Sequence, residues 1–226
     1  MVEPFFTDAD RAYLRANYFE LEELCAERPE RPAEVRDLID RGVMPRPSYT
    51  VDGREMFPAD YFQLFHDAGG VEGLREHFET RYRAAAKSHP ELATPAAIER
   101  AWQAYLDGIW GQCLNHVTPE VMVRKRALVD SLCKLVALPR PRSAEWRQRL
   151  RAEVDELDRI ERDFAPDYDR AEDWNDRPPT RDLLIETARR RFPEVFAQKR
   201  DSASLAASAN GRGQTPSGSD PIKAGA

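Results

Sequence analysis

The sequence predicts a mainly α-helical protein with one short β-hairpin near its N-terminus. Three observations lead to this fold class. Apolar residues recur every three to four positions over most of the chain, which is the spacing of one face of an α-helix. Helix-capping residues precede several of these segments. Strict alternation of apolar and polar residues, the sign of a strand, is confined to one stretch around an Asp-Gly dipeptide.

The first part of the chain predicts three short helices and the hairpin. Thr7 is expected to cap the helix "DADRAYLRANY", and "FELEELCAE" continues as a second helix. Pro32 suits the first position of a third helix, which Gly42 is expected to end. The hairpin follows in "PSYTVDGREMF", turning at Asp52-Gly53. Pro58 is predicted to start the next helix.

The rest of the chain predicts helices and then a polar tail. Thr118 and Ser143 each precede a periodic segment and are expected to cap it. After about Lys199 the residues are mainly Ser, Ala, Gly, Pro and Asn, which bury too little apolar surface to order a chain. We therefore expect three parts: a first module over residues 1–68, a helical domain over 69–198 and a disordered tail over 199–226. The helices are expected over residues 71–87, 95–117, 119–138, 144–164 and 181–192.

Charge and cysteine content indicate which partners and which cellular compartment to expect for the protein. The chain of 226 residues has 34 Lys and Arg against 40 Asp and Glu, a net charge of -6, so nothing in its overall charge favours phosphate or an anionic membrane. The three cysteines are odd in number and widely spaced, which indicates reduced thiols. No stretch approaches the length of a membrane helix. We expect a cytoplasmic protein.

The order helix, turn, helix, "RGVMPRP", hairpin and "FPADYFQLF" resembles the winged helix of MerR-type regulators, over about residues 18–66. The resemblance implies a winged-helix-like module whose second helix lies in the major groove of DNA. Two features argue against DNA binding. Arg54 directly follows Gly53 in the wing, one place early, and therefore faces the opposite side of the strand. Residues 1–65 hold eight arginines and fourteen acids, so their charge is 8 - 14 = -6.

A longer segment, about residues 19–193, resembles an uncharacterised bacterial family classed as a domain of unknown function. The segments "PSYTVDGREMFPADYF", "AGGVEGLREHF", "YLDGIWGQCLNHVTPE" and "FAPDYDR" followed by "TRDLLI" carry this resemblance. It implies a shared helical fold and no particular mechanism.

No phosphate loop, dinucleotide fingerprint, HExxH pattern or nucleophile elbow is found in the sequence. Cys113 and His116 are three residues apart in a predicted helix, so both side chains could face one metal ion, with His77 as a further candidate ligand. The structural alternative is a buried thiol and a histidine at a helix end. We favour the structural alternative and expect neither a bound metal nor a cofactor.

Two arginines in the C-terminal part suggest a site for an anion. Arg170 and Arg181, with Tyr168 and Trp174 near them in sequence, could clamp a carboxylate or phosphate ligand. Acidic neighbours make surface ion pairs the structural alternative. Catalytic residues are not identified, and whether the protein is an enzyme stays open.

Taken together, these features favour a non-catalytic protein that interacts with a protein partner or senses a small anionic ligand, with no membrane contact and a degenerate winged-helix module. The alternatives are a small metabolic enzyme with a site between the C-terminal helices and a MerR-like DNA-binding regulator.

Overall fold

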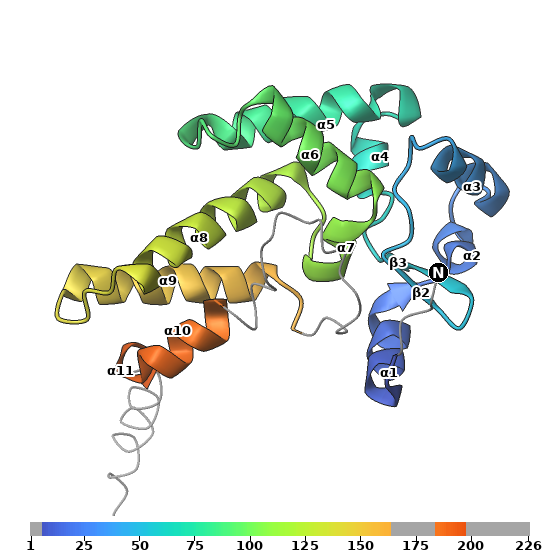
Figure 1. Ribbon diagram of the computed structural model, residues 1–226. Coiled ribbons are helices and arrows are strands. Elements are labelled where there is room, and N and C mark those ends of the chain that lie inside the picture. The colour runs from blue at the N-terminus through green and yellow to red at the C-terminus, as the bar shows by residue number, and fades with distance from the viewer. Residues whose placement is uncertain (1–5, 164–183, 198–226) are drawn as a thin grey trace, which may run out of the picture.

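The computed structural model describes residues 6–163 and 184–197. Figure 1 shows a mainly α-helical molecule, as the sequence predicted, with a small sheet and three short helices on one side and the longer helices on the other. In the described residues no helix is long and apolar enough to cross a membrane. The tail over residues 199–226 lies outside the described residues.

The N-terminal module, residues 6–67, surrounds a three-stranded antiparallel sheet. The strand order is β1-β3-β2, with Tyr18 opposite Pro58 and Tyr49 opposite Met56. The hairpin turns at Asp52-Gly53 as predicted, and both residues have the positive φ that this turn requires. Its elements are α1 (Asp8–Asn17), β1 (Tyr18–Phe19), α2 (Leu21–Cys25), α3 (Pro32–Asp40), β2 (Tyr49–Val51), β3 (Arg54–Pro58) and α4 (Gln63–Asp67).

One prediction for this module was wrong, and the hairpin prediction was confirmed but incomplete. Pro58 does not start a helix, because it is the last residue of β3 and pairs with Tyr18, and α4 begins only at Gln63. The hairpin is also not alone, because β1 adds a third strand. Two residues are too few for alternation to reveal a strand in the sequence.

After the N-terminal module, the described elements are all helices. The cap residues Thr118 and Ser143 each accept a hydrogen bond from the backbone N–H three residues later, as predicted. The helices are α5 (Val71–Ala85), α6 (Pro95–Leu106), α7 (Ile109–Cys113), α8 (Pro119–Ala137), α9 (Ala144–Ile160), α10 (Glu186–Arg191) and α11 (Pro193–Phe196), with a 3-10 turn at Ala86–Ser88.

The helix predicted over residues 95–117 is in fact two helices. Gly108 adopts a left-handed φ of +72° between α6 and α7 and breaks the helical path there. The segment before the hairpin causes this break: Arg46 N–H donates to the carbonyl of Leu106 at 2.7 Å, and the Ser48 hydroxyl donates to the carbonyl of Gly108 at 3.0 Å. A periodic pattern of apolar residues cannot report such long-range contacts.

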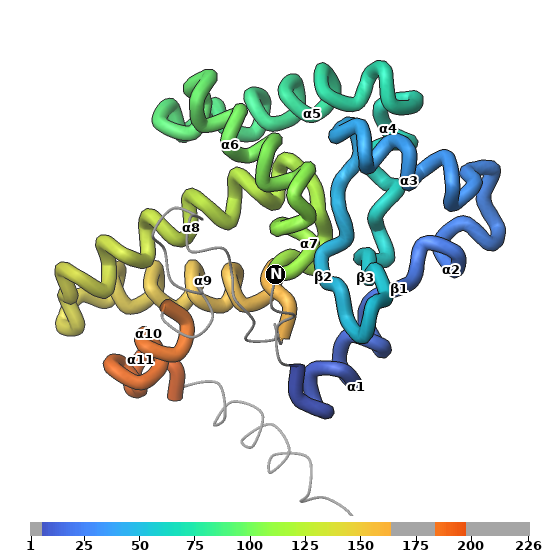
Figure 2. The backbone as a smooth tube through the Cα atoms, turned by 45° about the vertical axis from the view of Figure 1, so that its right-hand side comes forward, coloured from blue at the N-terminus to red at the C-terminus, as the bar shows by residue number. Residues whose placement is uncertain are grey.

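Helix α8 lies at the centre of the helical part and contacts both α5 and α9. Its first half joins a hydrophobic cluster that also contains Leu21 and Phe57 of the N-terminal module. Its second half packs against Trp146, Leu150 and other residues of the predicted stripe on α9. Figure 2 shows the hairpin beside α7, where the N-terminal module meets the longer helices.

Candidate functional site

The first candidate site is the face formed by α3 and the hairpin, which the resemblance to MerR-type regulators would place on DNA. Its arginines are paired with carboxylates. Arg36 Nη2 lies 2.8 Å from Glu22 Oε1, and Arg54 Nη1 lies 2.6 Å from Glu20 Oε1. Arg41 pairs with an acid one turn earlier in α3, Asp37, at 3.1 Å. The positive charge of this face is therefore neutralised within the protein.

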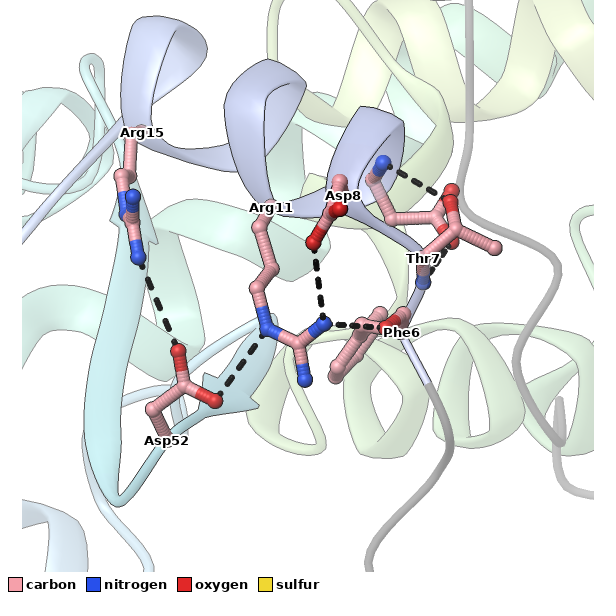
Figure 3. A network of polar contacts seen from close by, with 7 residues as sticks. Phe6, Thr7, Asp8, Arg11, Arg15 and Asp52 are labelled. Carbon is pink, nitrogen blue, oxygen red and sulfur yellow. Dashed lines mark hydrogen bonds and ion pairs between the residues drawn. The ribbon is translucent and has the colours of Figure 1, made fainter.

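The hairpin tip is pinned to α1 in the same way (Figure 3). Arg11 Nε donates to Asp52 Oδ1 at 3.3 Å, and Arg15 Nη2 lies 3.7 Å from Asp52 Oδ2. Arg11 also donates to the carbonyl of Phe6. The two turn residues of the predicted wing, Asp52 and Gly53, thus include an aspartate that is paired with two arginines of α1, and neither turn residue is a cation.

Seven of the eight arginines of residues 1–65 lie within 4.0 Å of a carboxylate oxygen. The eighth, Arg28, lies over the ring of Phe62 at 5.2 Å from its centre and contacts Nδ1 of His66. Exposed ion pairs of this kind contribute little to stability. Their consequence is electrostatic. Because acids outnumber arginines, pairing uses up the positive charges and leaves the module with a net negative surface.

The candidate metal ligands, which the sequence did not favour, are not brought together. Cys113 is the last residue of α7, and His116 follows in an exposed loop, so the premise that both lie on one helix was wrong. His77 lies on α5, with Nε2 3.4 Å from an arginine nitrogen of Arg81. Among the described residues no group of three His, Cys, Asp or Glu side chains is placed to hold a metal ion.

The predicted anion clamp of Arg170, Arg181, Tyr168 and Trp174 lies outside the described residues. It stays a prediction.

The structure reveals a second candidate site that sequence reasoning missed, a buried ion pair between Lys125 and Glu161. Lys125 comes from the middle of α8, and Glu161 follows the last residue of α9. Their Nζ and Oε1 atoms are 2.8 Å apart, and the two residues are only 5% and 3% exposed. The other carboxylate oxygen, Oε2 of Glu161, has no hydrogen-bond partner among the described residues.

The thiol of Cys113 lies beside the same ammonium group. Burial alone would lower the pKa of Lys125, but the neighbouring Cys113 and Glu161 side chains raise that pKa above its ordinary value. Lys125 is therefore held in its charged form. An ammonium group in that state is an ion-pair partner, whereas a nucleophilic lysine must lose its proton.

Backbone contacts position this cluster. Arg162 N–H donates to the carbonyl of Cys113, and Asn115 N–H donates to the carbonyl of Ile160, both at 3.0 Å. The residues between them, Leu114 and Glu161, form an isolated antiparallel bridge. The end of α9 is thereby held against the loop that follows α7.

The cluster is also tied to the N-terminal module. The Tyr18 hydroxyl donates to the carbonyl of Gly111 at 2.9 Å, and Arg162 Nε donates to the same carbonyl at 3.2 Å. The Arg162 guanidinium lies 4.6 Å from the centre of the Tyr18 ring. Burial raises the pKa of the Tyr18 hydroxyl, although Arg162 acts in the opposite direction. This polar junction joins β1, α7 and the end of α9.

One signal in the sequence could have indicated the pair. Lys125 is a charged residue within a helix that is apolar on several sides, and long charged residues are rarely fully buried without a partner. The sequence alone could not identify the partner, because Glu161 lies 36 residues away (161 - 125 = 36) in a segment rich in other acids.

These features define a mainly helical protein with a small antiparallel sheet, an acidic N-terminal part and a buried lysine–glutamate pair between two of its longer helices. The chain belongs to the family of unknown function DUF6058, whose family model matches residues 74–193, more than half of its length. The predicted membership of a domain-of-unknown-function family is confirmed over that range, which begins later than the predicted residue 19. No curated protein and no solved structure matches the chain.

Proposed function

We propose that this protein is a non-catalytic interaction protein whose N-terminal module binds a basic segment of a partner protein and does not read DNA. One observation carries the proposal: the arginines that a DNA-reading module would present are engaged by acids of the same module. Arg36, on the helix that would enter the groove, contacts both Glu22 and Glu55.

Exposed acids give this face its recognition chemistry. Glu34, Asp37 and Asp40 recur every three residues along α3 and are all exposed. Residues three and four apart lie on the same side of a helix, so these carboxylates form a strip. Glu34 is paired with Arg31 and Asp37 with Arg41, whereas Asp40 has no ion pair among the described residues. A duplex would be repelled by such a strip, whereas a partner rich in lysine and arginine would be attracted and correctly oriented. In its order of elements the module resembles a winged helix, and we keep that assignment as part of the proposal.

The competing proposal of a small metabolic enzyme finds less support. The most chemically promising cluster among the described residues contains Lys125, Glu161 and Cys113, but its lysine is held protonated by its neighbours. We place the protein in the cytoplasm, because Cys25, Cys113 and Cys133 are free thiols that suit a reducing compartment.

A lysine-rich peptide is a suitable probe of the acidic strip. The full chain is expected to bind the peptide in a salt-dependent manner, and D37N/D40N is expected to weaken binding several-fold. The matched control is E145Q/E194Q, which removes two negative charges from exposed positions on α9 and α11. Equal weakening by both double variants would contradict the proposal, because it would show attraction to overall charge and not to α3.

A further inference from the structure

An open hollow lies along α9, on the side that faces α10 and α11. Its volume is about 490 Å³, which is within the range of roughly 300–1,000 Å³ that is usual for small-molecule sites. Three arginines, three aspartates and one phenylalanine line it: Arg151, Arg159, Arg189, Asp155, Asp158, Asp163 and Phe196. The hollow is separate from both the acidic strip and the buried ion pair.

The spacing of residues on α9 explains why polar groups collect here. Arg151 and Arg159 are eight residues apart, with Asp155 halfway between them, so all three share one side of the helix. The opposite side carries Leu150 and Val154, which are fully buried against α8 and its neighbours. The amphipathic character of α9 therefore places two guanidinium groups along the same hollow.

The arginines of the hollow differ in what they contact. Arg189 Nη2 is paired with Asp158 Oδ2 at 2.7 Å. Arg151 and Arg159, by contrast, have no ion pair or hydrogen bond through their side chains to any described residue. Nη2 of Arg151 is moreover buried without an acceptor.

A buried guanidinium donor that lacks an acceptor costs free energy. The aspartates beside it do not supply that acceptor. Asp158 is paired with Arg189, and Asp155 and Asp163 have partners of their own. An anionic ligand would satisfy the free donors of Arg151 and Arg159 through charge-assisted hydrogen bonds.

The distance between the two arginines sets the kind of ligand. Eight residues along an α-helix span about 12 Å between Cα atoms, so two separated anionic groups suit the two side chains better than one compact ion does. A molecule with two anionic groups, joined by a short linker that could rest near Phe196, matches this layout. Carboxylate and phosphate groups both fit the planar guanidinium fork.

We propose that the hollow between α9 and α10–α11 binds a small molecule with two anionic groups, one held by Arg151 and the other by Arg159. This site goes beyond the proposed partner-binding function, and it uses other residues than the predicted clamp of Arg170 and Arg181. The proposed small-molecule site lies on α9, whereas the acidic strip proposed to bind a partner lies on α3.

Isothermal titration of the full chain with suberate and with 1,6-hexanediol bisphosphate, at constant ionic strength, tests the site. At least one of the two probes is expected to bind, and R151Q and R159Q are each expected to weaken its binding by about tenfold or more, the loss of roughly one charge-assisted contact. R142Q removes an exposed arginine just before α9 and should leave binding unchanged. Arg159 is itself exposed, so R159Q is expected to fold normally.

Three results would overturn the proposal: no binding of either probe, binding that survives both R151Q and R159Q, or an equal loss in R142Q. None of these results bears on the peptide-binding test of the acidic strip, so the two proposals fail separately.

Discussion

At the scale of single residues, the buried pair of Lys125 and Glu161 sets the strongest expectation for stability. Removing one partner leaves an uncompensated charge in the interior, which usually costs about 3–5 kcal/mol. Removing both leaves no such charge. The loss of one partner therefore costs much more free energy than the intact pair contributes to stability.

We expect K125M and E161Q each to lower the free energy of unfolding by about 3 kcal/mol or more, and K125M/E161Q to lower it by less than the sum. Urea denaturation of the three variants measures this. E156Q is the control, because it breaks the partly exposed pair with Arg124 and should cost much less. Additive losses in the double variant would contradict the described ion pair.

The same pair predicts a dependence on alkaline pH. The folded-state pKa of Lys125 lies above that of an unfolded lysine, about 10.4, so its contribution is fully present below that pH and is lost as the pH rises through the folded-state pKa. Tyr18, Tyr61 and Tyr105 also have pKa values raised by burial and destabilise the fold at alkaline pH.

The stability difference between the wild type and K125M isolates the lysine from these tyrosines. It is expected to stay constant up to about pH 10.4 and to shrink as the pH rises from there toward about 12 in urea denaturation. A difference that stays constant over that range would show that Lys125 keeps an ordinary pKa.

At the scale of elements, the turn between α6 and α7 depends on one glycine. Gly108 has a φ of +72°, and a Cβ placed there would lie 2.6 Å from the carbonyl oxygen of Arg46 and 2.8 Å from that of Pro47. Both contacts are with backbone, which cannot rotate away. The turn therefore requires glycine for conformation and for space together.

We expect G108A to destabilise the protein by clearly more than the roughly 1–2 kcal/mol that a left-handed conformation costs alone. G42A is the matched control, because Gly42 has a similar φ of +68° and no atom within 4 Å of the added Cβ. Thermal or urea unfolding of both variants gives the comparison. Equal losses would show that the close approach of residues 46 and 47 does not matter.

The elements also show how far sequence reasoning reaches. The caps at Thr7, Thr118 and Ser143 and the turn at Asp52-Gly53 were predicted correctly, because their signals are local. The break at Gly108 was missed, since contacts with residues more than fifty positions earlier in the chain produce it. Strand β1 was missed for a similar reason, because its pairing with β3 is long-range.

The sites follow the same rule. The acidity of the N-terminal module could be counted from the sequence, but the pairing of its arginines with particular acids could not. The partner of Lys125 and the hollow beside Arg151 depend on how α8, α9 and α10 pack. The predicted ligand residues Arg170 and Arg181 stay untested.

At the scale of the whole molecule, the N-terminal module and the longer helices share one hydrophobic cluster and one polar junction. The cluster contains Phe57 of the hairpin together with Phe78 and Trp110 of the helical part. The junction joins Tyr18 to Arg162 through the carbonyl of Gly111. We infer that the module is a fixed part of the body, so its acidic strip is presented to partners in a constant orientation.

We expect that this module, although its order of elements resembles a DNA-binding fold, does not bind duplex DNA. Titration of the full chain against a labelled duplex library of randomised sequence, at about 0.15 M salt, tests it most directly. We predict no saturation up to roughly 100 μM protein, the weak end of the Kd range in which DNA-binding proteins bind random duplex, and no enriched sequence after selection. Saturable binding with an enriched motif would contradict the claim and identify the protein as a DNA-binding regulator.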